Sequence, residues 1–161
     1  NSLLGPTFLE PVAKLTSFPM VIGLDGKDKM SKSMNNYLEI SASPEEIIAR
    51  IKTAMTDPAR VYRKDPGHPE VCNIYRFHQY FNPSQLAETA RKCTTAEMGC
   101  VECKMTIAKE IGKALEPFRE RRAELASRPD YIKDVLADGA KRARVIARET
   151  LNEAKQRMGL L

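Results

Sequence analysis

The sequence lacks the long apolar runs on which membrane insertion depends. No stretch of its 161 residues approaches the roughly 20 consecutive apolar residues of a membrane-spanning helix, and none has the apolar centre of a secretory signal. Internal repeats and low-complexity tracts are also missing. A membrane partner is therefore not expected. The first residue is Asn1 rather than Met, so we expect a shortened or processed chain.

The composition fits a folded globular protein. Hydrophobic residues make up 42% of the chain and charged residues 29%, whereas disordered chains are poorer in apolar residues. A chain of this length can bury the core of one ordinary domain. Its net charge of +5 is compatible with an anionic partner, although such a balance is common and does not identify one.

The most informative stretch is residues 23–36, which combine glycines with lysines and serines. Lys29 and Lys32 are three positions apart, so in a turn or in the first turn of a helix both ammonium groups can point to one side. Ser31 and Ser33 add hydroxyls, and the glycines let backbone N–H groups approach an anion. Such a loop suits a polyphosphate, because preorganised cations stabilise the charge that grows on a leaving oxygen. The alternative is an ordinary solvated basic loop.

The order of these residues carries a family resemblance. Lys-Met-Ser-Lys-Ser at residues 29–33 matches the full signature loop of class I aminoacyl-tRNA synthetases, KMSKS. Gly-Leu-Asp-Gly before it and Met-Asn-Asn after it resemble the bacterial tryptophanyl-tRNA synthetase version. The resemblance implies that Lys29 and Lys32 are catalytic, holding the ATP phosphates and stabilising the pyrophosphate as it leaves. It also implies that Met30, Ser31 and Ser33 shape the loop through hydroxyl and backbone contacts with ATP.

A short apolar segment precedes this loop. Residues 19–22 are predicted to form a buried strand, because Val21 and Ile22 are β-branched. In the resembled family the end of this strand lies beside the adenine of ATP, which implies backbone contacts from Met20 and Val21. Simple packing of both residues in the core is the alternative.

The resemblance covers only part of a synthetase. The family's N-terminal signature contains two histidines around Ile-Gly, but the two histidines of this chain, His68 and His78, follow the lysine loop and do not form that pattern. About forty residues precede the helical part, too few for a parallel sheet whose βαβ units take roughly thirty residues each. We therefore expect a C-terminal portion without the amino-acid pocket and without half of the ATP site, inactive by itself.

From residue 43 onward the pattern is helical. Ser43, Pro44 and Glu46 predict a helix start, with Ser as N-cap, Pro at the first position and a capping box. Asp57-Pro58 is expected to end this helix. Further helices are predicted over 71–81, 83–93, 100–127, 131–137 and 139–158, and Pro117 is expected to kink or divide the long one.

We expect a mainly α fold with a boundary near residue 42. The resemblance implies that residues 1–42 are the tail of a Rossmann-type catalytic domain carrying the lysine loop, and that residues 43–161 form a helical anticodon-binding domain. The last predicted helix has a basic flank, composed of Lys141, Arg144, Arg148 and Lys155. Phosphate binding is one interpretation of this flank. A solvated amphipathic face is the other, and the sequence alone favours it.

All four cysteines fall in one part of the chain, with the spacing Cys72-x20-Cys93-x6-Cys100-x2-Cys103. Cys100 and Cys103 share one face at the start of a predicted helix, where the partial positive charge of the helix terminus would favour thiolates. One four-thiolate metal site is the economical interpretation. Zinc usually uses two short Cys pairs, whereas iron–sulfur clusters accept irregular spacing. Disulfides or free thiols remain an alternative, the former disfavoured in a reducing cytosol.

The cysteine pattern is also similar to that of a subset of bacterial tryptophanyl-tRNA synthetases, in which a [4Fe–4S] cluster lies in the anticodon-binding domain. The family's first gap is slightly longer, while the second and third gaps agree. This resemblance implies a [4Fe–4S] cluster held by Cys72, Cys93, Cys100 and Cys103 as a structural or recognition element, with zinc as the alternative.

The resemblance implies a parent enzyme that joins L-tryptophan to tRNA(Trp), converting ATP, bound with magnesium, to AMP and diphosphate. It also implies a homodimeric, cytoplasmic protein. A tyrosyl-tRNA synthetase shares the lysine loop and is one alternative, disfavoured by the cysteines and by the Gly-Leu-Asp-Gly flank. The other is a non-enzymatic, metal-stabilised helical module that binds RNA or acts in redox chemistry.

Overall fold

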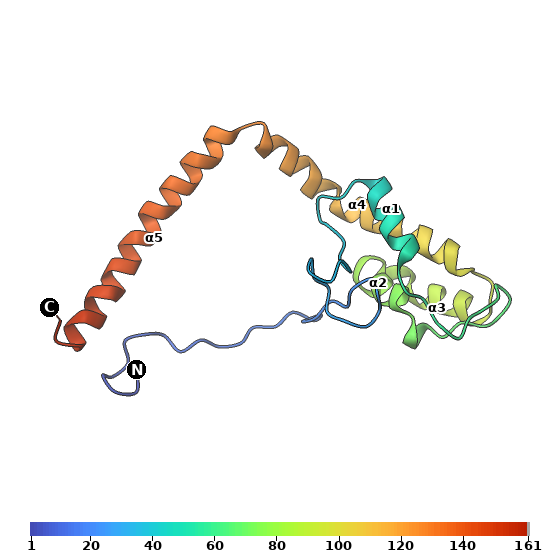
Figure 1. Ribbon diagram of the computed structural model, residues 1–161, viewed down its shortest axis with the longest axis horizontal. Coiled ribbons are helices and arrows are strands. Elements are labelled where there is room, and N and C mark those ends of the chain that lie inside the picture. Colours follow the sequence, from blue (N-terminus) through green and yellow to red (C-terminus); the bar gives the residue numbers. More distant parts are fainter. Residues whose placement is uncertain (161) are drawn as a thin grey trace. The chain divides into compact units, whose positions relative to one another are not determined.

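The computed structural model describes residues 1–160, which form helices joined by loops (Figure 1). The α-helices are α1 (Pro44–Thr53), α2 (Asn73–Phe81), α3 (Leu86–Thr94), α4 (Cys100–Ala126) and α5 (Pro129–Arg157), with short 3-10 helices η1 (Pro69–Val71) and η2 (Pro83–Gln85). Within residues 1–160 the only strand-like pairing is a single antiparallel bridge between Ile22 and Lys29. The mainly α fold class is confirmed. None of the helices in this range is both long and apolar enough to cross a membrane.

The chain divides into two compact units. One comprises Phe18–Arg122, and the other comprises Asn1–Ser17 together with the chain from Ala123 onward. This division does not coincide with the boundary near residue 42, because Ala42 is buried in the same hydrophobic cluster as residues of α1. The predicted division concerned the roles of the two parts, and in that sense it stays a prediction.

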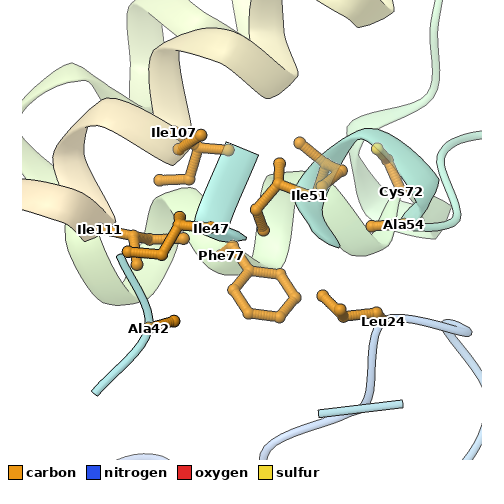
Figure 2. Packing of buried hydrophobic residues seen from close by; sticks show 11 residues of the cluster. Leu24, Ala42, Ile47, Ile51, Ala54, Cys72, Phe77, Ile107 and Ile111 are labelled. Carbon is orange, nitrogen blue, oxygen red and sulfur yellow. The ribbon is translucent and has the colours of Figure 1, made fainter. Parts of the chain in front are cut away.

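The core of the unit Phe18–Arg122 is built mainly from three helices (Figure 2). Its buried members are Leu24, Ala42, Ile47, Ile51, Ala54, Cys72, Ile74, Phe77, Ile107, Ala108 and Ile111. Full burial of one large aliphatic or aromatic side chain contributes about 1.5–3 kcal/mol. Because Leu24 and Ala42 come from the segment around the lysine loop, that segment is packed against α1, α2 and α4.

Helix α1 begins as the sequence predicts. The Ser43 Oγ accepts a hydrogen bond from the Glu46 N–H at 3.2 Å, and a carboxylate oxygen of Glu46 accepts one from the Ser43 N–H at 2.7 Å. The helix ends earlier than predicted, at Thr53 rather than at Asp57. The physical reason is a tertiary contact: the Met55 N–H donates to the Leu24 carbonyl at 2.8 Å instead of continuing the helix.

The predicted break near residue 138 is wrong. Helix α5 runs without interruption from Pro129 to Arg157, where the sequence predicted two helices. Gly139 lies inside it with no neighbouring atom near the position of a Cβ. A helical glycine costs about 1 kcal/mol relative to alanine, which is too little to divide so long a helix. Pro117 likewise lies inside α4 without dividing it.

Candidate functional site

The lysine loop is built on a tight reversal of the chain. Ile22 and Lys29 form the antiparallel bridge, flanked by hydrogen bonds from the Gly23 N–H to the Asp28 carbonyl at 2.8 Å and from the Met30 N–H to the Val21 carbonyl at 2.9 Å. The Asp25 Oδ1 accepts from the N–H groups of residues 27 and 28 at 3.0 and 3.2 Å. This side-chain turn closes the reversal. Lys29 therefore extends from a paired backbone position.

Asn36 ties the two sides of the loop together. Its side chain is 4% exposed, and its Nδ2 donates to the Asp25 Oδ2 at 2.6 Å and to the Lys29 carbonyl at 3.2 Å. Its Oδ1 accepts from the Ser31 N–H at 2.8 Å. A Cβ at Gly23 would collide with the Asn36 side chain, so only glycine leaves room for this arrangement. The sequence analysis used Asn36 as part of a flank and missed this structural role.

The Asp25 carboxylate is stabilised in its charged form. The Lys27 backbone N–H, followed by the Asn36 amide, holds the pKa of Asp25 below its usual value. At neutral pH the carboxylate therefore accepts hydrogen bonds from both groups, which keeps the reversal closed.

The two lysines of the KMSKS motif carry unpaired charge. Lys29 and Lys32 are exposed, and neither ammonium group forms a hydrogen bond or ion pair with any residue in the range 1–160. The hydroxyls of Ser31 and Ser33 lie 3.2 Å apart, and the Ser31 Oγ accepts from the Met34 N–H at 3.3 Å. The serines thus hold the loop backbone, while both cations remain available to an anion.

A cavity adjoins the loop within the same unit. It has a volume of about 510 Å³, and Ser31 and Lys32 line it together with Phe118 and Arg122 of α4. Two cationic side chains and an aromatic ring therefore face one space. The sequence analysis did not associate α4 with the loop, since these residues lie some ninety positions apart and no local pattern joins them.

The helical part anchors the loop at both ends. From α1, the Arg50 guanidinium donates to the carbonyls of Asn35 at 2.6 Å and Tyr37 at 2.8 Å. From α2, the Asn73 Nδ2 donates to the Gly23 carbonyl at 2.8 Å in a buried position. The loop backbone is therefore fixed by side chains of the helices that follow it. Neither anchoring residue was recognised from the sequence.

The segment before the loop departs from its prediction. Met20 is 56% exposed and Val21 37% exposed, so the predicted buried strand over residues 19–22 is wrong. Pairing of these four residues is limited to the Ile22 bridge and to the Val21 carbonyl, which accepts from the Met30 N–H, because residues 1–160 form no sheet that could cover the segment. The predicted contacts of Met20 and Val21 with adenine stay predictions.

The four cysteines lie around one cavity of about 20 Å³. Cys72 precedes the first residue of α2, Cys93 lies near the end of α3, Cys100 opens α4 and Cys103 follows one turn later. All four are free thiols. Within residues 1–160, no three Cys, His, Asp or Glu side chains are placed to hold a single metal ion. The thiols thus surround a common space without converging on one point.

Burial, rather than the partial positive charge of a helix terminus, determines the pKa shifts of three of the thiols. It raises the pKa of Cys103 to about 12 and also raises the pKa values of Cys72 and Cys93. The expectation that the start of α4 favours a thiolate is therefore wrong for Cys103. Without a metal, Cys72, Cys93 and Cys103 are therefore protonated at neutral pH, and binding a metal group would release their protons.

Arg60 brings positive charge to the edge of this cavity. Its Nη1 lies 3.9 Å from the Cys93 Sγ, and its Nη2 donates to the Met98 carbonyl at 2.9 Å. Its Nε is buried and has no hydrogen-bond partner in the part of the chain that the structure describes. A Cβ at Gly67 would collide with the Cys93 Sγ. The backbone at Gly67 and the Arg60 guanidinium therefore both lie close to the Cys93 thiol.

His78 also meets this cysteine group, and the sequence analysis assigned it no role. It is 0% exposed, with its Nε2 3.3 Å from the Cys103 Sγ and its Nδ1 3.4 Å from the Asn82 Nδ2. Burial lowers the pKa of His78, which favours the neutral ring. Asn82 directly follows α2, four residues after His78, and this helical spacing could have indicated their contact, but no local signal connects His78 with Cys103.

Comparison with known proteins places these features in a family. Residues 4–116 match the family described as tRNA synthetases class I (W and Y). A protein named tryptophan–tRNA ligase from Deinococcus radiodurans is 41% identical over 100% of this chain and 49% of its own length. A protein of the same name from Thermotoga maritima is 39% identical over the same shares. The chain spans about half the length of the curated relatives it matches.

The fold agrees with this relationship. A crystal structure described as tryptophanyl-tRNA synthetase from Campylobacter jejuni, complexed with ADP and tryptophan, superimposes with a TM-score of 0.80 at 29% identity. The match covers 99% of this chain and 50% of that one. The described residues therefore resemble one half of a solved synthetase.

Proposed function

The chain belongs to the class I tRNA synthetases for tryptophan and tyrosine, and from this membership we propose that it is the C-terminal portion of a tryptophan–tRNA ligase. The complete enzyme would join L-tryptophan to ATP, giving tryptophanyl-adenylate and diphosphate, and would then transfer the tryptophanyl group to tRNA(Trp). The names of the relatives support tryptophan over tyrosine. We place the complete enzyme, as a homodimer, in the cytoplasm.

The lysine loop would supply the cations for the first step. The observation that carries this role is the pair of exposed, unpaired ammonium groups of Lys29 and Lys32 on a backbone that Asn36, Arg50 and Asn73 hold in place. Negative charge grows on the diphosphate as the bond to the α-phosphorus breaks. Cations that are already oriented stabilise that charge without reorganisation. Met30, Ser31 and Ser33 would shape the loop, and Met20 and Val21 would contact the adenine.

The helical part would bind tRNA. We assign residues 1–42 to the tail of the catalytic domain and residues 43–161 to the anticodon-binding domain. Helix α5 has no buried side chain, and Lys141, Arg144 and Arg148 are exposed on it. Such cations add salt-dependent phosphate contacts, while recognition of the anticodon requires stacking and hydrogen bonding to unpaired bases.

The four cysteines would hold a [4Fe–4S] cluster. The donor set fits, because four free thiols from three helical regions surround one space and Arg60 carries positive charge at its edge. A cluster offers a separate iron to each thiolate, so its ligands need not converge on one point as the ligands of zinc must. The cavity of about 20 Å³ has room for about one water molecule. Held by the four thiolates, the cluster would cross-link α2, α3 and α4 as a structural element.

Diphosphate exchange in the complete enzyme tests the catalytic proposal. Lys32→Ala is expected to lower kcat/KM for tryptophan-dependent ATP–diphosphate exchange by about 10²-fold, because one preorganised cation is lost. Lys27→Ala is the matched control, since Lys27 is an exposed lysine of the same reversal that lies outside the motif. Equal effects of the two substitutions, or no effect of either, would contradict the proposal. Salt-dependent tRNA binding without any exchange activity would favour the RNA-binding module.

Elemental analysis tests the cluster. Protein purified without oxygen is expected to absorb broadly in the visible range and to contain about four iron and four sulfide per chain. One zinc per chain without colour would replace the cluster by a plain structural zinc site. Protein without any metal would remove the metal proposal and leave the lysine loop unaffected.

A further inference from the structure

A buried polar pair lies against one of the four cysteines. His78 of α2 is enclosed by the core, and its Nε2 is 3.3 Å from the Cys103 Sγ of α4. On the other side of the ring, the Nδ1 is 3.4 Å from the Nδ2 of Asn82, which is itself buried. The ring therefore has one polar neighbour at each nitrogen.

The chemistry of these neighbours selects one tautomer. A thiolate that ligates a metal has no proton, so the sulfur can only accept a hydrogen bond. The Nε2 of His78 must then carry the proton that is donated to Cys103. A neutral imidazole has a single N–H, so its Nδ1 must accept. The Asn82 amide Nδ2, which can only donate, lies at that nitrogen.

We propose that His78, held in this tautomer by Asn82, is a positioning residue that donates a hydrogen bond from Nε2 to Cys103 Sγ in the metal-bound protein. The inference rests on the proposed iron–sulfur site. Hydrogen bonds to the sulfurs are among the factors that set the reduction potential of a cluster. Because a donated proton stabilises the more negative, reduced form, His78 raises the potential. It also orients the Cys103 side chain and so slows loss of the cluster.

Paired substitutions separate the hydrogen bond from simple packing. His78→Leu keeps an apolar side chain in the core but removes the donor. His78→Gln restores a donor, because its amide Nε2 can take the place of the ring Nε2. Ile74→Val is the matched control, since Ile74 is buried on the same helix and lines the same cavity without a polar group. Each variant is made in the complete protein and purified without oxygen.

The measurements are the midpoint reduction potential, followed by visible absorption, and the rate at which absorption is lost in air. His78→Leu is expected to lower the potential and to speed the loss about tenfold, because loss of a residue that supports a metal ligand typically lowers metal affinity by at least this factor. His78→Gln is expected to lie close to the wild type, as is Ile74→Val. If His78→Leu does not fold, the ring ¹⁵N shifts of wild-type His78 decide: a protonated Nδ1 with an unprotonated Nε2 overturns the inference, and the reverse supports it.

The possible failures are distinct. Wild-type protein that contains the cluster, with all three variants alike in potential and in rate of loss, overturns the role of His78 and leaves the cluster in place. Wild-type protein without iron and sulfide overturns the proposed cluster and the role of His78 together.

Discussion

Asn36 shows how one side chain can set the shape of the lysine loop. Its amide group contacts the turn at Asp25, the carbonyl of Lys29 and the N–H of Ser31. These three partners lie on both sides of the reversal, so the loop backbone from Lys29 to Ser31 depends on a residue that carries no charge.

Removal of this amide should destabilise the protein. Asn36→Ala leaves the part-buried Ser31 N–H and Lys29 carbonyl without their partner, and a typical intramolecular hydrogen bond contributes about 0.5–1.5 kcal/mol. A urea unfolding curve should show a lower free energy of unfolding. Asn35→Gly is the control, because Asn35 has φ +50°, a conformation that glycine adopts freely. Equal loss in both variants would indicate general loosening of the loop rather than loss of the amide contacts.

Two glycines should respond in opposite directions to the same substitution. Gly112 lies in α4 with open space where a Cβ would project, so Gly112→Ala should stabilise the protein by about 1 kcal/mol through helix propensity. Gly67→Ala should destabilise it, because the added Cβ would collide with the Cys93 Sγ. Thermal unfolding of both variants checks the prediction. A stable Gly67→Ala variant would mean that the chain can move away from the cysteines at little cost.

At the scale of elements, α1 connects the lysine loop with the helical part. Its capping box sets where it begins, and Arg50 in its last turn contacts the loop backbone. The loop backbone is therefore held in part by the last turn of α1.

Loss of the cap should be measurable. Ser43→Ala should lower the free energy of unfolding by about 1 kcal/mol, the usual cost of removing an N-cap side chain. Ser41→Ala is the matched control, since the Ser41 hydroxyl is exposed and makes only a long contact of 3.5 Å with Glu39. Denaturant unfolding of the two variants compares them, and equal values would show that the cap contributes nothing beyond its exposed neighbour.

At the scale of the whole molecule, the two compact units differ in how they are stabilised. The unit Phe18–Arg122 contains the hydrophobic cluster and all four cysteines, whereas α5 of the other unit has no buried side chain. Stability is therefore concentrated in the first unit, and a metal group bound there should act on that unit alone.

Removal of the proposed metal group tests this difference by amide hydrogen exchange. Oxidation followed by a chelator should speed exchange in α2, in α3 and in the first turns of α4, because a group that binds only the folded form stabilises it. Exchange in α5 should not change. Peptide-resolved exchange before and after treatment gives the comparison, and uniform acceleration along the chain would contradict independent stabilisation of the two units.

The sequence by itself determined the features that depend on neighbouring residues. The capping box at Ser43, the helical periodicity and the order of residues in the lysine loop are local, because their chemistry acts over a few positions. The spacing of the cysteines also indicated that they belong together. Predictions from local patterns were wrong where tertiary packing or the length of a helix determines the structure. The examples are the early end of α1, the continuous α5 and the exposed segment around Met20.

Tertiary structure alone decided which residues surround the lysine loop and the four cysteines. Asn73 and Arg50 reach the loop from helices, and His78 meets Cys103 across 25 positions of the chain. Burial also reversed the expectation for Cys103, whose thiol has a raised pKa despite its place at a helix start. Such contacts and desolvation depend on how the helices pack. Packing is a property of the whole core, and no short pattern of residues specifies it.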